Sequence, residues 1–145
     1  MSLRIAIACD HAGFELKDGI LSFLNRTGYT TINLGVDSTD AVDYPDKARQ
    51  LAAEILEGRA DFGILICATG IGISIAANRH KGIRAALCTD SYMARMAREH
   101  NDANVLCLGG RVLGLALAED IVTTFLAGTF EGGRHLQRLT KIESQ

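Results

Sequence analysis

The sequence predicts an α/β fold with three layers, in which a five-stranded parallel sheet lies between two layers of helices. Short apolar runs alternate along the 145 residues with segments whose apolar residues recur at helical spacing. Such alternation is typical of parallel sheets, because parallel neighbours are joined through a crossover segment that is usually a helix. The length is that of one domain, which we expect to span residues 1–145.

Five apolar runs are predicted as strands: Arg4–Ala8, Thr30–Leu34, Phe62–Ile66, Ile83–Leu87 and Asn104–Leu108. Helical periodicity predicts six helices: Phe14–Arg26, Pro45–Glu57, Ile73–Arg79, Tyr92–His100, Val112–Leu126 and Gly133–Glu143. Pro45 suits a first helical turn, and Asp90 suits the N-cap of the fourth helix.

The last helix is predicted to be an extra element outside the strand–helix alternation. Its apolar and basic residues fall on different sides, Leu136, Leu139 and Ile142 on one and Arg134, Arg138 and Lys141 on another. Two glycines, Gly132 and Gly133, precede it and allow the chain to turn away from the body. We therefore expect this helix to dock on a neighbouring subunit.

Composition and charge argue against several classes of protein. A formal net charge of −2 and an aromatic content of 6% give no general basis for binding nucleic acid or an anionic membrane. No apolar stretch reaches the roughly 18–20 residues of a membrane span, and Arg4 interrupts the only run that could resemble a signal peptide. The four cysteines form no C-x-x-C pair, which favours reduced thiols in a cytoplasmic protein.

The segment Cys67–Ser74 carries the strongest chemical signal. An apolar run ends at Cys67, and the glycine-rich turn through Gly70 and Gly72 then begins a helix. The amide groups of such a turn stabilise both a thiolate and a developing oxyanion. Cys67 is therefore the leading candidate for a base or nucleophile, whereas Cys88 and Cys107 are interpreted as core residues and Cys9 as a weak second candidate.

Two other strand ends carry polar residues. Asp10 and His11 follow the first strand, and Arg111 follows the fifth strand after a pair of glycines. Since the carboxyl ends of parallel strands share one edge, these residues are expected beside Cys67. With His11, the basic residues Arg111, Arg134 and Arg138 would suit a dianionic phosphate.

Other polar motifs give weaker signals. His100 and Asn101 end a helix, where a histidine can be purely structural, and His80 and His135 are expected at the surface. The glycines after Cys67 do not complete a dinucleotide-binding fingerprint, and no group of His, Cys, Asp and Glu has the spacing of metal ligands.

Several ordered blocks together resemble the family of ribose-5-phosphate isomerase B and the galactose-6-phosphate isomerase subunits. The blocks cover almost the whole chain: Cys9–Gly13, Asp43–Pro45, Ile66–Asn78, Gly82–Ala86, His100–Leu106, Leu108–Arg111 and Phe130–His135. The resemblance implies a Rossmann-like fold and aldose–ketose isomerisation of a sugar phosphate through a cis-enediol, without a metal or an organic cofactor. It also implies a homodimer, or a dimer of dimers, with active sites shared between subunits.

The resemblance assigns a role to each matching residue. Cys67 matches the base that removes the proton, His100 the group that opens the sugar ring, and Thr69 a residue that assists ring opening or proton transfer. The remaining matches are substrate contacts: Asp10 and Asn101 to the sugar, the backbone of Ala68, Thr69, Gly70, Ile71 and Gly72 as an anion cradle, and His11, Arg111, Arg134 and Arg138 to the phosphate.

Two positions depart from the pattern of the family. One branch has a glutamate where this chain has Ile71, so the chain resembles the cysteine branch. Ala68 stands where many relatives have glycine, and its methyl group is expected close to the anion cradle.

Three alternatives to a ribose 5-phosphate isomerase remain open at this point. A six-carbon substrate, allose 6-phosphate or galactose 6-phosphate, would need only a slightly deeper pocket. A flavodoxin-like module that binds a nucleotide or flavin would share the sheet and the glycine turn, but it leaves Cys67, His100 and the arginines without a role. A structural subunit of a two-component isomerase would not need every catalytic residue type in one chain.

Overall fold

The structure is a computed structural model that describes residues 2–145, and it contains the predicted five-stranded sheet. The strands are β1 (Arg4–Cys9), β2 (Thr30–Asn33), β3 (Phe62–Cys67), β4 (Ala85–Leu87) and β5 (Val105–Gly109). They are all parallel and lie in the order β2-β1-β3-β5-β4. The prediction of a parallel α/β sheet with five strands is confirmed.

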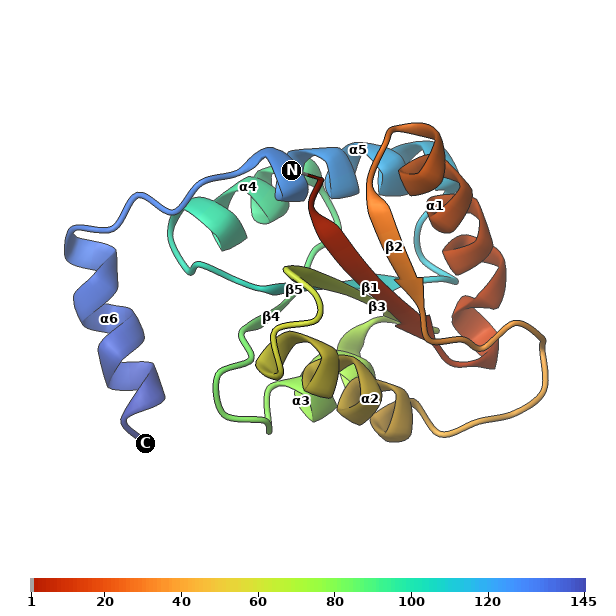
Figure 1. Cartoon of the computed structure of the whole chain (residues 1–145), viewed down its shortest axis with the longest axis horizontal. Coiled ribbons are helices and arrows are strands. Elements are labelled where there is room, and N and C mark those ends of the chain that lie inside the picture. The colour runs from red at the N-terminus through yellow and green to blue at the C-terminus, as the bar shows by residue number, and fades with distance from the viewer. Residues whose placement is uncertain (1) are drawn as a thin grey trace.

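Six α-helices accompany the sheet: α1 (Phe14–Arg26), α2 (Tyr44–Leu56), α3 (Ile71–Ala77), α4 (Ser91–Glu99), α5 (Leu115–Ala127) and α6 (Arg134–Glu143). A short 3-10 turn, η1 (His11–Gly13), precedes α1. Helices α1, α4 and α5 cover one face of the sheet and α2 and α3 cover the other, whereas α6 stands to the side of this body (Figure 1). Both Gly132 and Gly133 have positive φ, at 70° and 58°, which only glycine adopts readily and which lets the chain leave the body before α6.

The pleat of β3 divides the core into two layers and decides where Cys67 faces. Ile64 and Ile66 pack in the layer under α1, α4 and α5, while Leu65 and Cys67 pack in the layer under α2 and α3. Successive side chains of a strand point to opposite faces, so this alternation follows from the apolar run itself. Cys67 thus lies at the carboxyl end of a central strand, on the α3 side.

Element boundaries differ from the predictions where a local turn takes over the backbone groups. Strand β4 starts at Ala85 rather than Ile83, because the Ile83 amide donates to the His80 carbonyl in a turn. Helix α5 starts at Leu115 rather than Val112, because the amides of Val112 and Leu113 both bond to the Gly109 carbonyl. The predicted cap of α4 is present: the Asp90 carboxylate accepts from the Met93 amide at 2.8 Å.

The strand order creates a crevice at the carboxyl edge of the sheet. The chain moves outward from β1 to β2 and then returns to place β3 on the other side of β1. The segments after β1 and β3 therefore lead to helices on opposite faces, which leaves a gap between them where ligands of such sheets bind.

Among the helices of residues 2–145, none combines the length and apolar character that a membrane crossing requires.

We predict that Gly13→Ala destabilises the fold, because a Cβ at Gly13 would lie 2.7 Å from the backbone oxygen of Ile66 at the end of β3. The expected loss in the free energy of unfolding is about 1–3 kcal/mol, measured by denaturant titration. The control is Gly19→Ala in α1, whose Cβ would meet only the flexible end of the exposed Leu115 side chain. Alanine is also the better helix former, so this control is expected to cost little or to stabilise. Equal effects of the two substitutions would contradict the prediction.

Candidate active site

The Cys67 side chain accepts a hydrogen bond from the backbone of the turn that follows it. The Gly70 amide donates to the Cys67 sulfur at 3.2 Å, and the side chain is almost buried, with 5% of its residue surface exposed. Gly70 has a φ of 81°, and a Cβ there would lie 2.6 Å from Leu87 and 2.9 Å from the Leu108 backbone. Glycine is thus required for the turn that points this amide at the sulfur. This contact places a backbone N–H donor directly against the sulfur.

The neighbouring amides of the turn serve different acceptors. The Ile71 amide donates to the Thr69 hydroxyl oxygen at 3.1 Å. The amides of Gly72 and Ile73, in the first turn of α3, have no acceptor within residues 2–145. The family resemblance implies an anion cradle along the backbone of Ala68–Gly72. Within that segment, the Gly70 amide already donates to the thiol and the Ile71 amide to Thr69, whereas the Gly72 amide has no acceptor within residues 2–145.

The end of β1 brings Asp10 and His11 to the same edge. The buried Asp10 carboxylate accepts from the amides of Ala12 and Gly13 at 3.0 and 3.2 Å through one oxygen, so the carboxylate is oriented by η1. The His11 Nδ1 atom accepts from the Val42 amide at 3.3 Å. This contact places the proton of the neutral imidazole on Nε2, where it can be donated to an anion.

The end of β5 places Arg111 against the Cys67 turn. The amides of Gly110 and Arg111 donate to the carbonyls of Cys67 and Ala68 at 2.8 and 3.0 Å. A Cβ at Gly110 would lie 2.8 Å from the Ala12 carbonyl oxygen, so glycine allows the turns after β1 and β5 to touch. The three polar strand ends predicted to meet therefore do meet.

Tyr44, at the start of α2, also contacts this edge. A Cβ at Gly72 would lie 2.6 Å from the Tyr44 ring, so the aromatic ring packs directly against the first turn of α3. The sequence analysis gave Tyr44 no role, although it lies in one of the blocks that carry the family resemblance. Its only local signal is its position before Pro45 at a predicted helix start.

The other three cysteines lack the environment of Cys67. Burial raises the pKa of Cys9 to about 11 and that of Cys88 to about 12, and it also raises the pKa of Cys107. The prediction that Cys88 and Cys107 are core residues is confirmed. Cys9 packs in the core as well and is a poor candidate for a base.

A second group of predicted site residues lies at the opposite edge of the sheet. His100 and Asn101 follow α4 and precede β5, so they lie near the amino ends of the strands. The register pairs Gly63 with Val105 and Cys67 with Gly109, which separates the two edges by four residues, or about 13 Å along the strand. The exposed residues Arg134 and Arg138 belong to α6, which stands beside this second group. A single chain therefore does not bring His100, Asn101, Arg134 and Arg138 to Cys67.

His135, predicted at the surface, is buried, with 4% of its surface exposed. Its ring stacks on the His100 ring at a centroid distance of 4.2 Å and an interplanar angle of 15°. In α6, His135 precedes Leu139 by four residues and therefore shares the buried side of the helix, a relation that the sequence analysis did not use. Burial, together with His100 and the two arginines of α6, lowers the pKa of His135.

His100, Glu131 and His135 each offer one ligand atom, and these atoms lie within 4.8 Å of one another, a grouping that the sequence spacing did not reveal. Zinc binds imidazole nitrogens at about 2.0–2.1 Å along lone pairs that lie in the ring planes. Because the two rings are stacked almost in parallel, their lone pairs run side by side rather than converging. The group therefore fits a ring stack with an acidic neighbour, Glu131 at 3.5 Å, better than a three-ligand metal site.

Comparison with known proteins gives a consistent result. Residues 5–142 match the family model described as ribose/galactose isomerase. The chain is 50% identical to ribose-5-phosphate isomerase B of Escherichia coli, over 96% of this chain and 93% of the relative. It is 44% identical to a D-erythrulose-4-phosphate isomerase of Pectobacterium atrosepticum, over 97% of this chain and 93% of that one.

Solved structures of similar sequence share the whole fold. The ribose 5-phosphate isomerase of Thermotoga maritima superposes with a TM-score of 0.99 at 52% identity and full coverage of both chains. The ribose-5-phosphate isomerase B of Clostridium thermocellum gives a TM-score of 0.97 at 54% identity, covering 98% of this chain and 96% of that one.

We predict that His135 makes stability depend on pH. The pKa of His135 in the folded chain is lower than the ordinary 6.5. As the pH falls, the unfolded chain therefore binds a proton on this imidazole at a higher pH than the folded chain does. Its contribution to the free energy of unfolding is therefore complete above about pH 6.5 and is lost as the pH falls toward the lowered pKa. His135→Phe keeps a buried planar ring and cannot titrate. Denaturant titrations at about pH 7.5 and about pH 5.5 should show a larger loss for the unsubstituted chain than for this variant. Equal losses in the free energy of unfolding for the two proteins would contradict a role of His135 in this pH dependence.

Proposed function

The chain belongs to the ribose/galactose isomerase family, and we propose that it interconverts ribose 5-phosphate and ribulose 5-phosphate with Cys67 as the base. The observation that carries this proposal is the hydrogen bond from the Gly70 amide to the Cys67 sulfur, at the sheet edge where His11 and Arg111 also lie. Family membership makes the chain a sugar-phosphate isomerase. This contact supports Cys67, rather than one of the three other thiols, as the proton acceptor.

The proposed reaction moves two protons. The Cys67 thiolate removes the proton from C2 of the open-chain aldose and returns it to C1, while a second proton moves from O2 to O1. The intermediate is a cis-enediolate, and its negative oxygen lies against the amide of Gly72, which has no acceptor within residues 2–145. Thr69, whose hydroxyl already orients the Ile71 amide, is exposed to the same space and assists proton transfer between the oxygens.

Binding of the phosphate and of the sugar uses the other strand ends. Asp10 accepts hydrogen bonds from sugar hydroxyl groups through the carboxylate oxygen that η1 leaves free. His11 Nε2 and the Arg111 guanidinium donate to the phosphate. Holding the remote phosphate fixes C2 relative to the thiolate, and this positioning lowers the barrier of proton transfer.

The site requires a second copy of the chain. His100, Asn101, Arg134 and Arg138 lie at the amino edge and on α6, too far from Cys67 to act in the same chain. In a two-fold homodimer each chain offers these residues to the crevice of its neighbour, and a dimer of dimers would keep the same pairing. His100 of one chain then opens the sugar ring over Cys67 of the other, and both arginines of α6 complete the phosphate site.

The number of carbon atoms in the sugar is the most specific part of the proposal. The E. coli relative is named for ribose 5-phosphate, whereas the Pectobacterium relative is named for erythrulose 4-phosphate. A six-carbon aldose 6-phosphate, such as allose or galactose 6-phosphate, is the second candidate, because it would need only a slightly deeper pocket and because the matching family model is described as ribose/galactose isomerase. The flavodoxin-like alternative loses its support, since the chain belongs to an isomerase family.

The state of the thiols supports a cytoplasmic location. All four cysteines are free and buried, which suits a reducing compartment.

We predict that the purified protein exchanges the C2 proton of ribose 5-phosphate with solvent deuterium faster than that of allose or galactose 6-phosphate. Cys67→Ser should lower kcat by about 10²–10⁴, the usual worth of a general base, because a serine hydroxyl does not ionise near neutral pH. Cys88→Ser is the matched control and should keep kcat. Exchange that is faster with a six-carbon sugar would reject ribose 5-phosphate, and unchanged turnover of Cys67→Ser would reject the cysteine base.

We predict that two inactive variants restore each other. In a heterodimer of Cys67→Ser and His100→Asn, one site has both substitutions and the other has neither. Random mixing in equal amounts should recover about a quarter of the activity of the unsubstituted dimer. A mixture of Cys67→Ser with Asp10→Asn, whose substitutions lie in the same half-site, should stay inactive. Absence of activity in the first mixture would contradict a shared site.

A further inference from the structure

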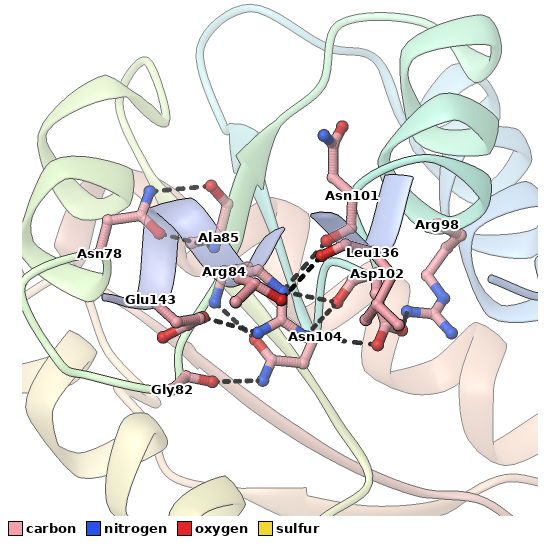
Figure 2. A network of polar contacts seen from close by, with 11 residues as sticks. Asn78, Gly82, Arg84, Ala85, Arg98, Asn101, Asp102, Asn104, Leu136 and Glu143 are labelled. Carbon is pink, nitrogen blue, oxygen red and sulfur yellow. Dashed lines mark hydrogen bonds and ion pairs between the residues drawn. The ribbon is translucent and has the colours of Figure 1, made fainter. Parts of the chain in front are cut away.

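We propose that Arg84 is a positioning residue for the half of the active site that each chain offers to its partner. This inference rests on the proposed function. Arg84 lies immediately before β4, outside the crevice that contains Cys67, and neither the family resemblance nor the sequence pattern assigned it a role. Its guanidinium joins the two elements that carry the offered residues, the loop after α4 and the helix α6 (Figure 2).

On the side of the loop, Arg84 binds backbone carbonyl groups. Nε donates to the carbonyls of Asn101 and Asp102 at 3.0 and 3.2 Å, and Nη2 donates to the Asp102 carbonyl at 2.9 Å. These carbonyls belong to the first two residues after His100. The position of the His100 imidazole and of the Asn101 amide therefore depends on where the guanidinium lies.

On the side of the helix, Arg84 binds a carboxylate. Nη1 donates to Glu143 at 2.8 Å in the last turn of α6, and the Arg84 side chain is mostly buried, with 22% of its surface exposed. Elsewhere in α6, Leu139 and His135 are buried, and the His135 ring stacks on that of His100. The ion pair thus fixes the far end of the helix whose first turns carry Arg134 and Arg138.

The loop needs this support because its backbone is strained. Asp102 has a φ of 45°, a region that residues other than glycine rarely adopt. The Asp102 carboxylate is held by Arg98 at 2.9 Å and by Arg84 at 3.4 Å, and Arg98 also donates to the Ala103 carbonyl. Two arginines therefore maintain a turn that would otherwise relax and move His100.

The Arg84 backbone is held as firmly as the side chain. Its amide donates to the Asn104 side-chain oxygen at 2.8 Å, while the Asn104 nitrogen donates to the Gly82 carbonyl at 2.8 Å. With the main chain fixed, the planar guanidinium reaches the loop and α6 from one point. A lysine ammonium has the same charge but lacks the rigid fork of donors, so it could bind one of these elements and not both.

The proposal predicts different kinetic effects for substitutions at Arg84 and at Glu143. Arg84→Met removes support from the loop and the helix together, and Arg84→Lys removes at least one of the two. Glu143→Gln weakens only the contact to α6, whose arginines bind the remote phosphate. Arg84 variants should therefore lower kcat and raise KM, whereas Glu143→Gln should raise KM alone, at most about fivefold.

The first test is steady-state isomerisation of ribose 5-phosphate by the full-length dimer. We expect Arg84→Lys and Arg84→Met each to lower kcat/KM by about 10²-fold, as expected for a displacement of about 1 Å at a reacting group. The control Arg26→Met removes an exposed arginine with a 3.8 Å ion pair to Glu119 and should leave both constants unchanged. Circular dichroism and sedimentation accompany each variant. Full activity of Arg84→Lys would show that charge alone matters and would overturn the proposal.

The second test assigns Arg84 to one half-site by subunit mixing. Arg84→Lys mixed with Cys67→Ser should recover activity, because one site of the heterodimer then combines an intact Cys67 with a loop held by an intact Arg84. Arg84→Lys mixed with His100→Asn should not recover, because both changes affect the same half-site. The reverse pattern, or no recovery in either mixture, would overturn the proposal.

The two proposals fail in different ways. If Cys67→Ser and His100→Asn do not restore each other, the shared site itself is wrong, and the role of Arg84 falls with it. If that pair succeeds and the Arg84 mixture fails, only the role of Arg84 is wrong.

Discussion

The hydrogen bond from the Gly70 amide to the Cys67 sulfur is the contact on which the proposed chemistry depends. It requires a positive φ at Gly70 and the close approach of the Leu108 backbone, and both require the absence of a side chain. The same packing lets Gly110 and Arg111 bond to the turn from β5. A methyl group at Gly70 would therefore disturb the environment of the thiol and the strand end that carries Arg111. This shared dependence explains why the segment is the most informative part of the sequence.

The sheet and its carboxyl edge could be predicted from the sequence because they depend on local patterns. Apolar runs and helical periodicity located all five strands, and the parallel topology then placed Asp10, Cys67 and Arg111 together. The start of β4 could not be predicted in this way. Ile83 and Arg84 belong to the predicted strand, yet neither amide pairs with a neighbouring strand. The Ile83 amide donates to the His80 carbonyl in a turn, and the Arg84 amide donates to the Asn104 side chain.

The second half of the site depends on contacts that no local pattern contains. His135 lies four residues before Leu139 on the buried side of α6, but its ring stacks on that of His100 and so joins α6 to the end of α4, a contact that no local sequence pattern contains. Arg84 shows the same limit, since the sequence predicted only that it lies within the strand Ile83–Leu87 and gave its side chain no partner. Its role becomes visible only when the loop of Asn101 and the end of α6 are seen to converge on one guanidinium.

The arrangement of the proposed dimer follows from the topology of a parallel sheet. Residues that follow strands lie at one edge and residues that precede strands lie at the other, so His100 cannot join Cys67 without a second chain. Since His100 and α6 are linked through Arg84 and through the ring stack, each chain would offer its neighbour one rigid unit rather than separate side chains. The distance between the thiolate and the two arginines of α6 is then set by the docking of that unit. In this arrangement, the length of the accepted sugar phosphate depends on the subunit interface as well as on the residues that line the crevice.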